Sequence, residues 1–295
     1  MPWPLSGVRP RERLADYTSF RIGGEAEWFA EPSTIEELAA ILREASRRGL
    51  PVSVVGGGTN TLIADRGIRG VVLRLGRGFR TVEEHSPGEP EAARVSCGAA
   101  LLTQRLVVLA ARAGWGGLEA LAGLPGRVGG AVMMNAQDIG RFVEAVQLVE
   151  PDGSAIRHLT REQMRFGYRD AALGAGIVAT VHLRFPRVAP REAEAAVRQA
   201  LRYRNETQET GLPSAGCAFK NPPGLKAGRM IDEAGLKGAR IGDACVSFRH
   251  ANFIVNAGHA TCDDVLSLME HVQRQVFRTF QVRLEPEVRL LGERW

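Results

Sequence analysis

The sequence has few cysteines and histidines, and neither type is spaced for metal binding. Its four cysteines, Cys97, Cys217, Cys245 and Cys262, form no C-x-x-C pair, and its six histidines are dispersed. These spacings argue against a zinc site and against a disulfide framework. For Cys97, Cys245 and Cys262 we therefore expect reduced and mostly buried thiols, as in a cytoplasmic protein. The role of Cys217 stays open at this point.

The chain also lacks long apolar runs. No charged segment followed by an apolar stretch opens the sequence, and no run approaches the roughly 20 apolar residues that span a bilayer. We therefore expect a cytoplasmic protein without membrane insertion.

Lysine is scarce, and the positive charge comes from scattered arginines. The net charge is +5, yet the arginines stand beside Asp or Glu, and the densest cluster, Arg198 to Arg204, shares a helical pattern with glutamates. A small polyanionic substrate explains this mild bias without a nucleic-acid partner. The oligomeric state stays open, and a monomer is compatible with the sequence. The lysines are Lys220, Lys226 and Lys237.

Apolar residues recur at helical spacing in some segments and at strand spacing in others. Thr34 and Thr261 are suited to cap two helices, since acidic residues follow each of them within three positions. Helices and strands that do not alternate regularly predict an α+β protein with a boundary near residue 190 and a subdivision near 75. The expected helices cover 35–45, 102–113, 193–201 and 265–280, and the expected strands cover 143–149, 177–185 and part of 282–295.

Two glycine-rich segments are candidates for binding an anionic cofactor. "VVGGGTN" at 54–60 follows a strand pattern, and its glycines and short polar residues could approach phosphate oxygens. It contains no G-K-[ST] and no helix pattern follows it, which excludes a Walker loop and a Rossmann fingerprint. "GLPGRVGGA" at 123–131 is apolar on both sides and too rich in glycine for a regular element. A ligand-free turn remains the alternative for 54–60, but two loops without a helix behind them favour a long cofactor in a cleft between subdomains.

With both loops in view, the chain resembles the bacterial UDP-N-acetylenolpyruvoylglucosamine reductases over nearly its whole length. The matching stretches occur in order and are far more specific than a single glycine motif. They are "TSFRIGGEAEWFAEP" (18–32), "VVGGGTNTLI" (54–63), "GLEALAGLPGRVGGAVMMNA" (117–136), "FGYRD" (166–170), "AGCAFKNP" (215–222), "AGRMIDEAGLKGARIGDACVS" (227–247), "HANFIVNAG" (250–258) and "LEPEVRLLG" (284–292).

The resemblance implies non-covalent FAD in a fold of the vanillyl-alcohol-oxidase/p-cresol-methylhydroxylase type, with a C-terminal α+β substrate-binding domain. It divides the chain into FAD-binding subdomains at 1–75 and 76–190 and a substrate-binding domain at 191–295, whose last strand returns to the active site. It also implies that NADPH reduces the flavin and that hydride then reaches the enolpyruvyl ether of a UDP-sugar, giving UDP-N-acetylmuramate for peptidoglycan synthesis. The short chain is similar to the second structural type of the family.

The residue roles that the resemblance implies are chemically consistent. Arg169 and Glu287 would stabilise the enolate-like charge that follows hydride transfer, and a carboxylate in that role requires a raised pKa. Strand-end surface residues are the alternative for both. The remaining candidates are Gly56, Gly57, Gly58, Thr59 and Asn60 at the FAD pyrophosphate, Gly123, Pro125, Gly126, Gly129, Gly130 and Ala131 beside the flavin, Arg204 near the cofactor, and Tyr168, Lys220 and Asn221 at the UDP-sugar, with no metal ligand.

Two single positions and one short segment depart from the family pattern. Ala171 stands where the family commonly has serine, and Glu209 stands where a proline is usual. "NAQDIG" at 135–140 replaces the usual N-A-G-A-Y-G, so the contribution of its tyrosine is missing or supplied elsewhere. These differences concern local contacts and leave the resemblance intact.

Cys217 occupies the position at which the family motif carries the proton-donating serine. The resemblance implies that its neutral thiol protonates the carbon next to the carboxylate, and that activity falls as the thiol ionises. A buried core cysteine is the alternative. For the whole protein, the alternatives are a flavin-dependent oxidase of a small alcohol or amine, which often tethers FAD through His or Cys, and a flavin-binding regulatory module without chemistry.

Overall fold

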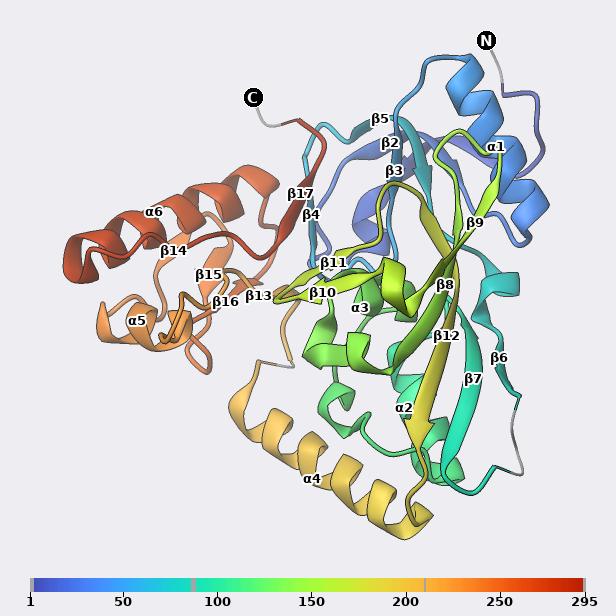
Figure 1. Ribbon diagram of the computed structural model, residues 1–295. Coiled ribbons are helices and arrows are strands. Elements are labelled where there is room, and N and C mark those ends of the chain that lie inside the picture. Colours follow the sequence, from blue (N-terminus) through green and yellow to red (C-terminus); the bar gives the residue numbers. More distant parts are fainter. Residues whose placement is uncertain (1–2, 86–88, 210, 294–295) are drawn as a thin grey trace. The chain divides into compact units, whose positions relative to one another are not determined.

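The computed structural model describes residues 3–85, 89–209 and 211–293, and its mixture of helices and strands confirms the α+β class (Figure 1). The chain divides into two compact units, each assembled from separate stretches. Unit 1 comprises Met1–Arg9, Phe29–Gly57 and Val71–Arg204, and unit 2 comprises Pro10–Trp28, Gly58–Gly70 and Asn205–Trp295. The three-part division at residues 75 and 190 stays a prediction.

An antiparallel five-stranded sheet forms the centre of unit 1. Its strands follow the order β6-β7-β12-β8-β9, and both expected strands are confirmed as β8 and β12. Alternate residues of these strands are buried, and the ring of Phe185 on β12 packs against Trp115 and Phe142. The strands are β6 (Val82–Glu84), β7 (Ala92–Gly98), β8 (Val143–Val149), β9 (Ile156–Thr160) and β12 (Ile177–Pro186).

The helices begin and end largely where the sequence predicts. Thr34 accepts a hydrogen bond from the Glu37 amide at the start of α1, and Gly114 in the left-handed region ends α2. The third expected helix extends further in both directions than its apolar residues indicate. In the described ranges no helix combines the length and apolarity needed to cross a bilayer. The bounds are α1 (Ile35–Arg47), α2 (Thr103–Ala113) and α4 (Pro190–Thr207).

One expectation for the second glycine segment is wrong. Residues Val128–Met133 form a short helix, α3, directly behind the loop, and α3 packs against β7 and β12 (Figure 1). The glycines are tolerated in this helix because Gly129 lies against Ala99, where an added Cβ would come within 2.8 Å of the alanine Cβ. Close packing therefore offsets the helix-weakening effect of glycine here.

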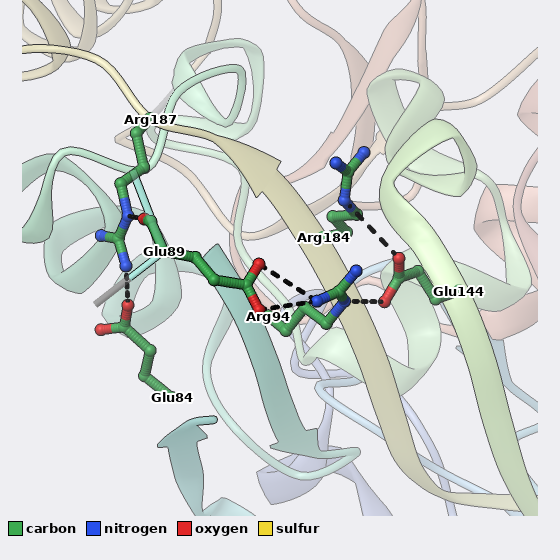
Figure 2. Close-up of polar contacts among 6 residues, drawn as sticks. All are labelled: Glu84, Glu89, Arg94, Glu144, Arg184 and Arg187. Atoms are coloured by element: carbon green, nitrogen blue, oxygen red, sulfur yellow. Dashed lines mark hydrogen bonds and ion pairs between the residues drawn. The ribbon is translucent and has the colours of Figure 1, made fainter. Parts of the chain in front are cut away.

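The charged residues near the five-stranded sheet pair with one another (Figure 2). Arg94 contacts Glu89 at 2.9 Å and Glu144 at 3.5 Å, and Arg184 reaches the same Glu144 at 3.8 Å. Partly exposed pairs of this kind contribute only about 0–1 kcal/mol each to stability. Their clearer effect is to neutralise the arginines of this region locally.

Unit 2 is built around a second antiparallel sheet of order β13-β16-β15-β14. Helix α6 packs against β14, β15 and α5, and its stripe from Val265 to Val276 is buried as expected. Thr261 and Asp264 form a capping box at its start. The elements are β13 (Ser214–Cys217), α5 (Ala227–Glu233), β14 (Arg240–Ile241), β15 (Ala244–Val246), β16 (Phe253–Asn256) and α6 (Cys262–Phe280).

The end of the chain returns to the segment that follows the first glycine loop. Strand β17 (Arg289–Leu291) pairs in parallel with β4 (Thr61–Ile63), and both belong to unit 2. The strand expected within 282–295 is therefore confirmed at β17, while Arg294 and Trp295 lie outside the described residues. The remaining strands are β1 (Val8–Arg13), β2 (Glu25–Ala30), β3 (Val52–Val54) and β5 (Ile68–Leu73), in the sheet order β1-β2-β5-β3, and the hairpin of β10 (Arg165–Gly167) and β11 (Asp170–Ala172).

Candidate active site

The first glycine loop, 56–60, connects β3 to β4 without a helix, as the sequence predicts. Gly58 has φ +63°, and a Cβ there would collide with the backbone carbonyl of Tyr17. Only glycine allows this approach to the 3-10 helix η1 (Leu14–Tyr17) without strain. Gly56 differs, because a Cβ added there would meet no atom within 4 Å. The loop is thus packed at Gly58 and open at Gly56.

A buried arginine links the two glycine segments within unit 1. Arg127, directly before α3, donates from Nε to the Gly56 carbonyl at 3.2 Å and from Nη1 to the Ala100 carbonyl at 2.5 Å. Burial lowers the pKa of Arg127 to about 10, and the nearby charges of Arg74 and Arg80 act in the same direction. Positive charges therefore lie near Arg127, partly balanced by Glu31, which pairs with Arg74 at 3.1 Å, and an anion beside Gly56 would offset the cost of burying the guanidinium.

The second glycine segment is held in shape by Gln104 of α2. Its side chain donates to the carbonyls of Leu121 and Leu124 and accepts from the Gly123 amide, all at 2.7–2.8 Å. Arg204 of α4 lies over the same loop, since a Cβ on Gly123 would come within 2.7 Å of the Arg204 Cδ. The structure thus brings Arg204 to Gly123, and its place near the cofactor stays a prediction. The neighbouring members of the segment are Pro125, Gly126, Gly129, Gly130 and Ala131.

These residues fit the diphosphate and ring system of FAD. A Cβ added to Gly130 would meet no atom within 4 Å, so the backbone of α3 is open on that side, as it is at Gly56. The buried guanidinium beside Gly56 is suited to an anionic group, and the open, uncharged backbone at Gly130 leaves room for a flat ring. Unit 1 therefore has the chemistry that a flavin dinucleotide requires.

Tyr168 and Arg169 form the two-residue turn of the hairpin β10 (Arg165–Gly167) to β11 (Asp170–Ala172) in unit 1. Arg169 has φ +58°, a left-handed conformation that costs a non-glycine residue about 1–2 kcal/mol. Its guanidinium lies 5.6 Å from the centre of the Tyr168 ring, which is 59% exposed. Such strain is retained where surrounding contacts fix the backbone, and it is frequent at functional sites.

Cys217 ends β13 in unit 2 immediately after a β-bulge. The register shifts between Ser214, paired with Val255, and Cys217, paired with Phe253, so the bulge contains Gly216 with φ +76°. A bulge with a left-handed glycine turns the side chain that follows it out of the regular alternation. Cys217 is half-buried, whereas Cys97 and Cys262 are fully buried. It is therefore more accessible than a core cysteine.

Glu287 lies on the segment that pairs with the residues directly after Cys217 in the same unit. Its amide donates to the carbonyl of Ala218 at 2.8 Å, and the next pairs along are Phe219 with Pro286 and Lys220 with Glu285. Asn60 donates from Nδ2 to the Glu287 carbonyl at 3.1 Å. Two of the three catalytic candidates thus occupy neighbouring antiparallel segments, while Arg169 belongs to unit 1.

The two polar candidates after Cys217 have different surroundings. The Lys220 ammonium lies 3.4 Å from the Glu285 carboxylate, and both side chains are well exposed. Asn221 accepts a hydrogen bond from the amide of Ala227 at 3.0 Å, which stabilises the start of α5. Lys220 thus offers an exposed point charge, and Asn221 has a structural contact in addition to its expected role at the sugar.

Asn252 is a supporting residue that sequence reasoning missed. Its buried amide accepts from the Phe219 amide at 3.0 Å and donates to the Phe219 carbonyl at 2.8 Å, while its own carbonyl accepts from Ala218 at 2.7 Å. These bonds fix the segment directly after Cys217. The position of Asn252 within "HANFIVNAG" was the only sequence signal. Gln104 and Arg127 were also missed, because the sequence around a polar residue does not reveal which groups its side chain will bind in the fold.

The departures from the family pattern have structural counterparts. Ile139, at the position of the usual tyrosine, is 1% exposed and belongs to the core of unit 1. Ala171 is buried in β11, and Glu209 accepts a hydrogen bond from Ser247 at 3.1 Å. In this chain the tyrosine position therefore contributes packing and no hydroxyl group.

We expect His250 to make the stability of unit 2 depend on pH. Burial lowers its pKa, and its Nδ1 accepts a bond from the Asn252 amide. Because the unfolded chain binds the proton more readily, stability should fall as pH decreases through about 6.5 toward the lower folded value. Urea unfolding between pH 5 and 8 should show a shallower acid loss for His250→Gln. Parallel profiles for both proteins would contradict this assignment.

Comparison with known proteins identifies the family. The FAD binding domain family matches residues 26–158, and the C-terminal domain of UDP-N-acetylenolpyruvoylglucosamine reductase matches residues 207–291. A reductase of that name from Syntrophotalea carbinolica is 40% identical over 98% of this chain and 95% of its own length, and reductase 2 of Symbiobacterium thermophilum is 43% identical over 97% and 92%. The crystal structure of the Thermus caldophilus reductase has a TM-score of 0.81 at 39% identity and covers 97% of this chain and 100% of its own. The chain is an FAD-dependent oxidoreductase and belongs to the UDP-N-acetylenolpyruvoylglucosamine reductase family.

Proposed function

We propose that this protein catalyses the NADPH-dependent reduction of UDP-N-acetylglucosamine enolpyruvate to UDP-N-acetylmuramate in the cytoplasm. The proposal rests on family membership over the whole chain and on one structural observation. The segment after Cys217 pairs with the segment carrying Glu287, since the Glu287 amide donates to the Ala218 carbonyl at 2.8 Å. In this pairing the proposed proton donor and the proposed acid lie on neighbouring segments, as the second half of this reaction needs.

Unit 1 would hold the cofactor. When bound, FAD would supply the hydride, which would come from NADPH. Gly56 and Gly57 at the end of β3 would offer backbone amides to the diphosphate, and Arg127 would offer its charge. The flavin ring would lie along Gly129, Gly130 and Ala131, with Arg204 covering the preceding loop at Gly123. In unit 2, Gly58, Thr59 and Asn60 would continue the first loop.

The chain's own residues would handle the charge and the proton. Hydride addition to the terminal methylene leaves an enolate-like charge delocalised onto the carboxylate. Arg169 would bind this charge, and Glu287 in its neutral form would donate a hydrogen bond to it. The Cys217 thiol would then deliver its proton to the carbon next to the carboxylate, which completes the saturated ether. Tyr168, Lys220 and Asn221 would contact the UDP-sugar.

An anaerobic absorbance assay tests the proposal. NADPH should bleach the flavin, and the enolpyruvyl UDP-sugar should restore its absorbance with formation of UDP-N-acetylmuramate. If NADPH bleaches the flavin but this substrate does not reoxidise it, the proposed reaction is wrong. Bleaching of the flavin by a small alcohol or amine, with reoxidation by O2, would favour an oxidase of the same fold, and the absence of any redox cycle would favour a binding module.

A further inference from the structure

The loop that lacks the usual tyrosine contains a buried asparagine with both ends of its amide in use. Asn135 is 9% exposed and lies two residues beyond the end of α3. Its backbone amide donates to the Val132 carbonyl. Its Oδ1 accepts from the Gly140 amide at 2.9 Å, and its Nδ2 donates to the Gly167 carbonyl at 2.9 Å. One side chain thus connects the loop 135–140 to the hairpin that carries Tyr168 and Arg169.

The bond to Gly167 acts at a sensitive point of the hairpin. The Gly167 carbonyl belongs to the peptide group that enters the turn, directly before Tyr168. Its orientation therefore helps to set the backbone of the next two residues, including Arg169 at φ +58°. A turn in a costly conformation needs external restraints to remain populated, and the Asn135 amide is such a restraint.

Packing supports the same connection. A Cβ on Gly140 would collide with the Phe166 ring and would come within 2.8 Å of the Asn135 Oδ1. Phe166 belongs to β10, so the hairpin lies closely against the loop where the asparagine binds. The loop is itself unusual, because Asn135, Gln137 and Asp138 all have positive φ values. It therefore retains a specific shape at a conformational cost.

We propose that Asn135 is a positioning residue for the reaction, because it fixes the Tyr168–Arg169 turn relative to α3 and its glycine segment. This inference rests on the proposed function, in which Arg169 stabilises the enolate-like charge and α3 lies beside the flavin. Asn135 itself contacts neither reacting group; it acts through the backbone of Gly167. The side-chain amide would thereby order a loop in which the usual tyrosine is absent.

Two substitutions change the side-chain amide of Asn135 but keep a residue that tolerates the left-handed backbone at this position. Asn135→Gly permits the left-handed conformation but removes both hydrogen bonds, whereas Asn135→Asp keeps an acceptor for Gly140 and loses the donor to Gly167. The matched control is Gln137→Gly, which removes an exposed side chain from a left-handed position of the same loop. Each variant is compared with the wild type as the FAD-loaded protein.

Both Asn135 variants should slow substrate-driven flavin reoxidation by roughly tenfold to a hundredfold, the range for leaving a buried polar group unsatisfied. Flavin reduction by NADPH and FAD content should change little. Hydrogen exchange of the 165–172 amides should accelerate in the Asn135 variants and stay unchanged in Gln137→Gly. In an Arg169→Ala background, Asn135→Gly should cause no further loss, since the asparagine acts through the arginine.

The outcomes distinguish this inference from the proposed function. Wild-type reoxidation rates and unchanged hairpin exchange in Asn135→Gly would overturn it, as would an additive loss in the double variant. If the wild type itself does not reduce the UDP-sugar, the proposed function fails, while hydrogen exchange still decides whether Asn135 orders the hairpin. Equal acceleration of exchange in the Asn135 and Gln137 variants would also refute a specific role for the amide.

Discussion

Replacing Cys217 by alanine is expected to leave flavin reduction by NADPH intact and to slow the reaction of the reduced enzyme with the UDP-sugar by about a hundredfold to ten-thousandfold. The size follows from the usual contribution of a positioned proton donor. Only the second half-reaction should suffer, because the thiol has no part in flavin reduction by NADPH, whereas an enolate-like intermediate that receives no proton can revert to the substrate. Stopped-flow absorbance of the flavin under anaerobic conditions measures the two half-reactions separately.

The serine variant and a second cysteine provide the controls. Cys217→Ser should retain measurable turnover, since a hydroxyl can also donate a proton, and it should lose the alkaline decline that ionisation of a thiol produces. Cys245→Ala removes a half-buried thiol from β15 of the same unit and should keep full turnover. An alanine variant at position 217 with wild-type reoxidation would overturn the assignment of Cys217 as the proton donor.

Replacing Arg169 by alanine is expected to lower kcat/KM for the UDP-sugar by roughly a hundredfold to a thousandfold, as loss of a group that stabilises developing charge does. Arg169→Lys should recover only part of this, because an ammonium cannot bind a carboxylate bidentately. Steady-state kinetics with the enolpyruvyl substrate, together with the rate of flavin reduction by NADPH, measure the effect.

The same hairpin offers a matched control. Arg165 is exposed at the start of β10, and Arg165→Ala removes an equal charge without changing the turn. Its kcat/KM should stay within about twofold of the wild type, as surface charges are weakly coupled across solvent. If Arg169→Ala loses no more activity than Arg165→Ala, charge stabilisation by Arg169 is refuted. The variant Glu287→Gln applies the same test to Glu287, the proposed neutral acid in unit 2.

Features encoded locally in the sequence were predictable. The caps at Thr34 and Thr261, the apolar stripe of α6 and the strands β8 and β12 follow from short-range periodicity and side-chain hydrogen bonding. The helix α3 was missed for a local reason as well. Its glycines disfavour a helix by intrinsic propensity. The helix forms nevertheless because Gly129 packs closely against Ala99, where a larger residue would not fit.

The candidate site was predictable in its residue types but not in its connections. The motifs give Cys217, Glu287 and Arg169 without indicating that the Glu287 amide binds the Ala218 carbonyl, or that Asn60 binds the Glu287 carbonyl. Such contacts join residues more than two hundred positions apart in one case and about seventy in the other. No local pattern contains that information.

By itself, the sequence determined the class of fold, the family and the identity of the residues available for chemistry, because these depend on composition, periodicity and ordered motifs. The tertiary structure decided which side chains support them. Arg127 lies beside Gly56, Asn252 fixes the segment after Cys217, and Asn135 connects α3 to the Arg169 turn. The physical reason is that a buried polar group must find a partner wherever the folded backbone places one. Its function therefore depends on long-range packing, which the spacing of residues along the chain does not specify.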